Sequence, residues 1–84
     1  MGPQELHDFV RHRPFEPFRI VMTDGAGFDI RHPDLLMVGE RSAVVGVPRS
    51  PQDALYERTI KVDLRHVIRI EPLPLGSPPA TGAN

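Results

Sequence analysis

Hydrophobic side chains recur at helical spacing near the start of the chain. Leu6, Phe9 and Val10 stand at positions i, i+3 and i+4, and polar residues fill most of the remaining positions. Pro3 suits the first turn of a helix, and Pro14 disfavours helical backbone at the residue before it. The pattern therefore predicts a short helix that begins at Pro3 and ends before Arg13, because of Pro14. A helix of this length is not stable alone in water, so its apolar stripe must pack against the rest of the chain.

From residue 18 onward, hydrophobic and polar residues alternate with the period of a strand. Segments of this kind, or continuously apolar ones, predict five or six short strands, at 18–23, 28–31, 35–38, 43–47, 59–65 and 67–71. The segment 43–47 is apolar throughout, which is typical of a strand covered on both faces.

Turn-forming residues separate these segments. The pair Asp24-Gly25 predicts a tight hairpin between the first two strands. His32-Pro33-Asp34 interrupts the chain after the second strand, and Asp34 is expected to cap the short turn that follows. The loop 48–55 contains two prolines and cannot continue the preceding strand.

One helix followed by short strands and brief turns predicts a mainly β (α+β) fold. The expected architecture is an N-terminal helix and a five- to six-strand antiparallel barrel, SH3-like or Sm-like. The helix would lie across one open end and cover it with Leu6, Phe9 and Val10. Residues 1–72 form a single small domain in this interpretation. Residues 73–84 carry no charge and three prolines, so they are expected to be a disordered Pro-rich tail.

The order of elements resembles the Sm-like family, and the bacterial RNA chaperone Hfq in particular, over roughly residues 4–72. Residues 18–25, Phe-Arg-Ile-Val-Met-Thr-Asp-Gly, resemble the first strand and turn of that family. Residues 64–68, Leu-Arg-His-Val-Ile, are similar to its closing segment Tyr-Lys-His-Ala-Ile, with Arg65 in place of the lysine and His66 on the histidine. The resemblance implies a ring of copies paired through strand edges, with this turn touching RNA phosphates at a central pore.

Several positions depart from the pattern of that family. Asp34, the counterpart of an acidic residue that organises the nucleotide pocket, follows a proline that breaks the strand. No aromatic residue is an obvious base-stacking platform, because Tyr56 is expected in a loop and Phe28 in the core. The chain also resembles small uncharacterised bacterial proteins with a Pro-Phe-x-Ile, Asp-Gly and His-Pro-Asp pattern, which implies no activity.

Composition narrows the possible functions. The 84 residues include ten basic and eleven acidic side chains, for a net charge of -1, which excludes a polybasic nucleic-acid binder. Nine of the ten cations are arginine, which suits phosphates and carboxylates but also follows from a GC-rich genome. The lack of cysteine excludes disulfides and thiolate chemistry. No apolar run is long enough to span a membrane and no leader is recognised, so a cytoplasmic protein without a membrane partner is expected.

The candidate RNA contacts are Arg65 and His66, extended by Arg11 and Arg13 at the end of the helix. The alternatives are a plain surface turn for the first pair and cations that complement the helix dipole for the second. His7 and His12 are five positions apart, which is not the spacing of a helical metal site. We predict no metal, cofactor or catalytic residue.

The sequence therefore predicts a non-enzymatic oligomeric binding protein that associates through strand edges and binds RNA in the manner of Sm-like proteins. The alternative is a protein-interaction or assembly module with no nucleic-acid role.

Overall fold

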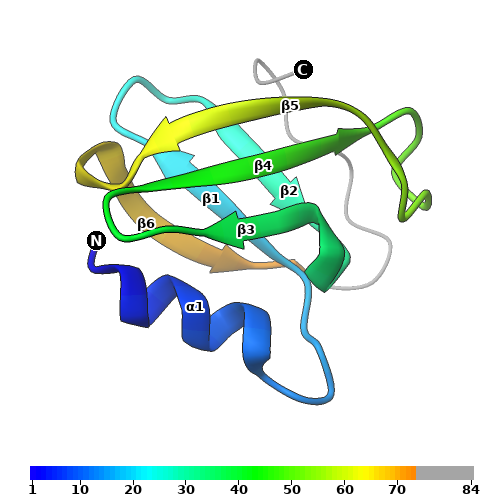
Figure 1. The fold of residues 1–84 in the computed structure, drawn as a ribbon, viewed down its shortest axis with the longest axis horizontal. Coiled ribbons are helices and arrows are strands. Elements are labelled where there is room, and N and C mark those ends of the chain that lie inside the picture. The colour runs from blue at the N-terminus through cyan, green and yellow to red at the C-terminus, as the bar shows by residue number, and fades with distance from the viewer. Residues whose placement is uncertain (74–84) are drawn as a thin grey trace.

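The chain begins with a helix and continues as short strands in the computed structural model, which describes residues 1–73. The elements, in chain order, are α1 (Pro3–Arg11), β1 (Phe18–Met22), β2 (Gly27–Ile30), the 3-10 helix η1 (Pro33–Leu35), β3 (Leu36–Val38), β4 (Ser42–Pro48), β5 (Tyr56–Asp63), the 3-10 helix η2 (Leu64–His66) and β6 (Val67–Pro72) (Figure 1). The predicted helix and the six strands are confirmed.

The strands form two antiparallel sheets of three strands each. The strand order is β2-β1-β6 in one sheet and β3-β4-β5 in the other. The central strands are therefore β1 and β4, and the other four lie at sheet edges. A mainly β fold with an N-terminal helix is confirmed, but among the described residues the hydrogen bonds do not close the strands into one barrel.

The hairpin between β1 and β2 forms where Asp24-Gly25 predicted it. Gly25 has a φ of 91°, a left-handed conformation that glycine adopts without a steric penalty. The side chain of Asp24 accepts a hydrogen bond from the backbone N–H of Ala26 (2.9 Å). Both features fix the reversal that brings β2 back along β1.

The interruption after β2 is a 3-10 turn whose cap differs from the prediction. The ring Nδ1 of His32, and not the side chain of Asp34, caps η1, because it accepts from the backbone N–H of Asp34 (3.3 Å). Leu35, expected to begin the third strand, belongs to η1 and is buried at 1% exposure. The break lets the chain leave one sheet and enter the other.

The fifth strand begins earlier and ends earlier than predicted. Tyr56 is the first residue of β5 and not part of a loop, and β5 pairs with β4 up to Asp63. Tyr56 packs over Gly46 of β4, where an added Cβ would lie 3.1 Å from the Cβ of Tyr56. Leu64, predicted as a strand residue, lies in η2, because Asp63 caps that turn.

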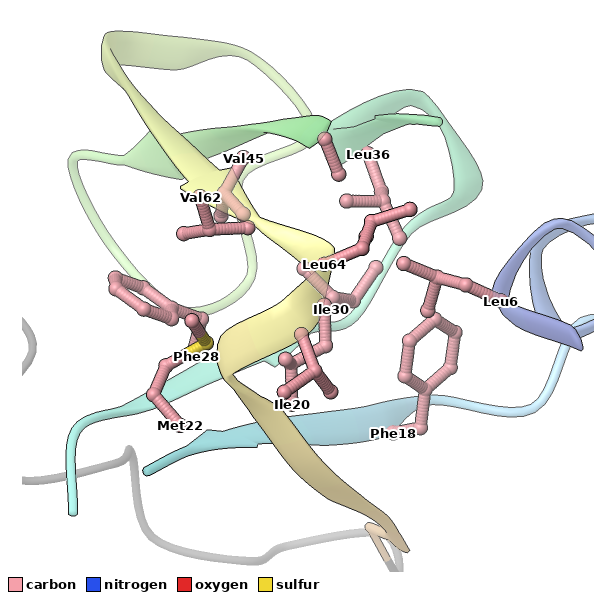
Figure 2. Packing of buried hydrophobic residues seen from close by; sticks show 12 residues of the cluster. Leu6, Phe18, Ile20, Met22, Phe28, Ile30, Leu36, Val45, Val62 and Leu64 are labelled. Carbon is pink, nitrogen blue, oxygen red and sulfur yellow. The ribbon is translucent and has the colours of Figure 1, made fainter. Parts of the chain in front are cut away.

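One hydrophobic cluster joins α1 to both sheets. Leu6 is fully buried and points from α1 toward Phe18 and Ile30, as Figure 2 shows. Phe9 was predicted to cover the core with Leu6 and Val10, but 43% of its surface is exposed. Its ring packs against that of Phe18, at a centroid distance of 5.3 Å. The helix thus covers the core mainly with one turn, around Leu6.

The folded segment reaches one residue past the expected boundary. Leu73 is buried at 8% exposure, and its backbone N–H donates to the carbonyl oxygen of Pro17 (3.0 Å). The predicted disorder of the remaining tail, residues 74–84, lies outside the described residues.

Candidate functional site

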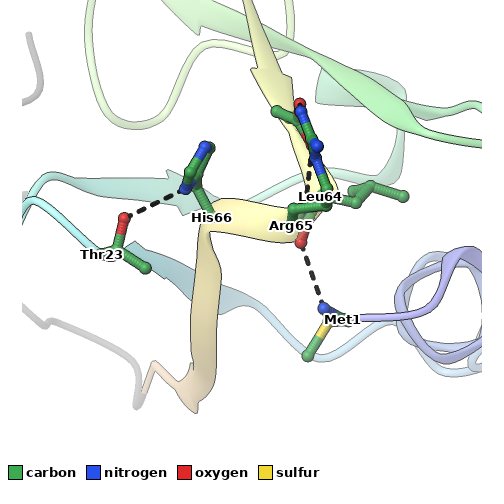
Figure 3. Close-up of polar contacts among 6 residues, drawn as sticks. Met1, Thr23, Leu64, Arg65 and His66 are labelled. Carbon is green, nitrogen blue, oxygen red and sulfur yellow. Dashed lines mark hydrogen bonds and ion pairs between the residues drawn. The ribbon is translucent and has the colours of Figure 1, made fainter.

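The predicted RNA-contacting turn is η2, between β5 and β6. Leu64 anchors it, because its side chain is buried at 3% exposure and its N–H donates to the carbonyl oxygen of Arg41 (3.0 Å). The amino group of Met1 donates to the carbonyl oxygen of Leu64 (3.1 Å), which places the start of α1 beside this turn (Figure 3). The next two residues, Arg65 and His66, are exposed.

Arg65 is held by an acidic neighbour. Its Nη2 lies 2.9 Å from Oδ2 of Asp63, and its Nε lies 3.3 Å from both carboxylate oxygens. The side-chain hydrogen bond from Arg65, followed by the bond from its backbone N–H, lowers the pKa of Asp63 to about 2. The same contact raises the pKa of Arg65. Asp63 therefore offsets much of the positive charge of this turn.

His66 faces the end of β1. Its Nδ1 lies 3.5 Å from the hydroxyl oxygen of Thr23 (Figure 3). Its carbonyl oxygen accepts from the backbone N–H of Thr23 (2.8 Å). The imidazole remains on the surface, so it could donate a hydrogen bond to a ligand.

The other two predicted contacts lie at the far end of α1. Arg11 is in the last turn of the helix, and Arg13 donates from Nη1 to the carbonyl oxygens of Val10 (2.8 Å) and His12 (3.0 Å). Because a helix rises about 1.5 Å per residue, this end is more than about 10 Å from η2. The structure brings together Arg65 with His66, and Arg11 with Arg13, but not the two pairs. The guanidinium of Arg13 is thus engaged by carbonyl oxygens at the end of α1, and its predicted contact with RNA stays a prediction.

An apolar groove that the sequence did not reveal lies between α1 and the sheet of β1 and β6. It has a volume of about 450 Å³, with Phe9, Phe18, Ile70 and Pro72 in its walls. Acidic residues at its rim, Asp8 and Glu16, accompany His12. The helical spacing assigned Phe9 to the core, so the sequence did not indicate that 43% of its surface is exposed beside a groove.

A second groove contains three arginines, contributed by the residue that follows β2, the loop after β4, and β5. Its volume is about 310 Å³, and Arg31, Arg49 and Arg58 line it. These residues are distant in sequence, so no local motif could have pointed to them.

Residues 1–73 hold no group of three or more histidine, aspartate or glutamate side chains that could bind a metal ion. They also include no buried polar or charged residue. The single α-helix in this part of the chain is too short to cross a membrane.

Comparison with known proteins gives no relative. No family model matches the chain, and neither the curated proteins nor the solved structures contain a match. The likeness to Sm-like proteins therefore stays an expectation from the residues.

Proposed function

We propose that this protein is a non-enzymatic binding protein whose copies associate into a homo-oligomer through open strand edges. We also propose that its two sheets are the halves of a small SH3-like or Sm-like barrel. Two observations support the barrel: one hydrophobic cluster is shared by both sheets and α1, and β6 follows η2 directly and returns to pair with β1.

The observation that carries the proposal is that four of the six strands have an edge with no hydrogen-bonded neighbour among the described residues. Within residues 1–73, β2, β3, β5 and β6 each pair with one strand only. Large exposed hydrophobic side chains lie on three of these strands: Met37 on β3 (73% exposed), Tyr56 on β5 (58%) and Ile68 on β6 (51%). Open edges with apolar side chains favour pairing with another chain.

The longest open edge is that of β5. The backbone N–H of Leu64 donates to the carbonyl oxygen of Arg41, and this pair continues the β4–β5 register by one residue. In an antiparallel ladder, every second residue of a strand hydrogen-bonds to the neighbouring strand, and the residues between them face away from it. Ile60 and Val62 therefore direct their backbone groups toward β4. Thr59 and Lys61 direct theirs away from it, where a strand of a second copy could bind.

The edge of β6 is also open, and it borders the apolar groove. The backbone N–H of Leu73 donates to the carbonyl oxygen of Pro17, which continues the β1–β6 register by one residue. Because hydrogen-bonded pairs alternate, the backbone groups of Ile70 and Pro72 face away from β1, toward the open edge. Proline is tolerated at such a position because the missing N–H would face outward. Ile70 and Pro72 also line the groove beside Phe9, which would add apolar contact to strand pairing.

A proline substitution on β5 tests this proposal. Thr59→Pro removes an N–H that faces the open edge and leaves the bonds to β4 in place, whereas Thr59→Ala keeps that N–H. We expect the proline variant to have a lower native mass by light scattering than Thr59→Ala, with the same circular dichroism spectrum. Equal oligomeric masses for both variants would contradict pairing through β5.

RNA binding is the second candidate function, and the exposure of Arg65 and His66 on one turn favours it. A cation and an imidazole donor suit phosphate oxygens. The contact with Asp63 and the net charge of -1 count against strong binding.

Fluorescence anisotropy with a single-stranded RNA at two salt concentrations tests this second candidate. RNA binding through phosphates should weaken steeply as salt rises. The double variant Arg65→Ala/His66→Ala should bind less RNA, while Arg11→Ala/Arg13→Ala reports whether the far end of α1 contributes. Tight binding that is indifferent to salt would contradict phosphate recognition.

A protein-interaction module without nucleic acid remains the alternative use of the same edges. A monomeric native mass and no RNA binding would favour it, because the open edges and the apolar groove would then serve a different protein chain.

A further inference from the structure

The arginine-lined groove is distinct from η2 and from the apolar groove, and it borders the edge strand β5, which contributes Arg58. It lies where the end of β2, η1 and the β4–β5 connection meet. Leu35 (1% exposed) and Val47 (5%) are core residues that form part of its wall, together with Pro48. The groove thus combines apolar surface with three guanidinium groups.

Charge in the groove is unevenly compensated. Asp29 is held by two arginines, with Oδ1 2.7 Å from Nε of Arg19 and Oδ2 3.3 Å from Nη2 of Arg31. Glu57, the other acidic residue in the wall, is 3.8 Å from Nε of Arg49, and both side chains are at least half exposed. Such an exposed contact is weak and exchanges readily with solvent or ligand.

Arg58 is the cation with no compensation. No hydrogen bond or ion pair joins its side chain to any residue in the described part of the chain. It lies on β5, across the β4–β5 ladder from Val47, and so adjoins the apolar wall. Its guanidinium offers a planar fork of N–H donors in a groove that already contains Arg31 and Arg49.

We propose that this groove binds a small organic anion that carries a carboxylate on an apolar body. The planar fork of a guanidinium matches a carboxylate with two parallel hydrogen bonds. Arg58 receives the carboxylate, Arg49 moves from Glu57 to assist it, and the apolar body packs on Pro48 and Pro51, which lie over the core at this point.

The size and composition of the groove favour this ligand class over a nucleic-acid strand. A volume of about 310 Å³ is in the range of a small-molecule site. The carboxylates of Asp29 and Glu57 in the wall would repel a chain of phosphates, whereas a single anion can sit on the side of Arg58.

A titration with phenylacetate tests the proposal, with binding measured from the amide chemical shifts of the 15N-labelled protein. The controls are phenylacetamide, which lacks the charge, and acetate and inorganic phosphate, which lack the apolar body. We expect phenylacetate to shift the amides of Val47, Arg49 and Arg58 and to bind more tightly than any of the three. Binding of the amide as strong as that of phenylacetate, or no shift at these residues, would overturn the proposal.

Substitutions of exposed arginines locate the contact. Arg58→Gln should weaken phenylacetate binding about tenfold, because a charge-assisted hydrogen-bond pair is lost. Arg58→Lys keeps the charge but loses the planar fork, so its affinity for phenylacetate should lie between those of Arg58→Gln and the unmodified protein. Arg11→Gln, at the end of α1, should bind phenylacetate as tightly as the unmodified protein does. An Arg58→Gln variant with a native-like spectrum and unchanged affinity would refute the assignment, whatever the oligomeric state.

Discussion

The guanidinium of Arg65 contacts the carboxylate of Asp63 at two nitrogen atoms, and the backbone N–H of Arg65 donates to the same carboxylate (2.9 Å). One acidic side chain therefore both caps η2 and binds the cation that the turn presents. The residue expected to contact RNA phosphate already has an anionic partner within the turn. An RNA phosphate would have to compete with Asp63 for it.

This contact predicts a specific titration. The pKa of Asp63 falls to about 2 in the folded protein, below the ordinary value of 3.8. Since the folded pKa is depressed, the contact stabilises the turn fully above about pH 4 and is lost as the pH falls through about 2. The side-chain carbon shift of Asp63 should have its midpoint near pH 2, and Arg65→Gln should move it upward. An ordinary midpoint in the unmodified protein would contradict the two-point contact.

The helix predicts a difference between two of its apolar residues. Leu6 is fully buried, so Leu6→Ala should lower the free energy of unfolding by about 2–5 kcal/mol, through lost transfer energy and a cavity. Phe9 is 43% exposed, and Phe9→Ala should cost about 1 kcal/mol. Urea unfolding of both variants gives the comparison. A larger loss for Phe9→Ala than for Leu6→Ala would contradict the packing of α1.

The first hairpin predicts a residue-specific cost at Gly25. Its φ of 91° is strained for alanine although the space around it is open, so Gly25→Ala should cost about 1 kcal/mol or more. Gly25→Asn should cost less, because asparagine adopts left-handed backbone more readily. Thermal unfolding of the two variants checks the order, and equal stability of Gly25→Ala and the unmodified protein would contradict the turn conformation.

The strands could be predicted from the sequence because their signals are local. Alternation of side chains located β1 and β2, and Asp24-Gly25 located their hairpin. The end of β5 could not be read in this way, because Leu64 continues the alternation while the side chain of Asp63 turns the chain into η2. The exposure of Phe9 also depends on where α1 docks, which its own periodicity does not specify.

The candidate sites depend still more on distant residues. The turn with Arg65 and His66 was identified in sequence, but its compensation by Asp63 depends on side-chain positions, with Nη2 of Arg65 2.9 Å from Oδ2 of Asp63. The groove of Arg49 and Arg58 forms only when β4 and β5 pair, so neither residue was distinguishable from an ordinary surface arginine. The open edges likewise follow from strand order, which local patterns leave undetermined.

The native mass of the unmodified protein, measured by light scattering over a range of dilutions at two salt concentrations, tests assembly through strand edges most directly. We predict a closed multiple of the 9.4 kDa chain that persists on dilution and changes little with salt, because backbone pairing and apolar contact hold the copies together. A mass of 9.4 kDa at every concentration would contradict it.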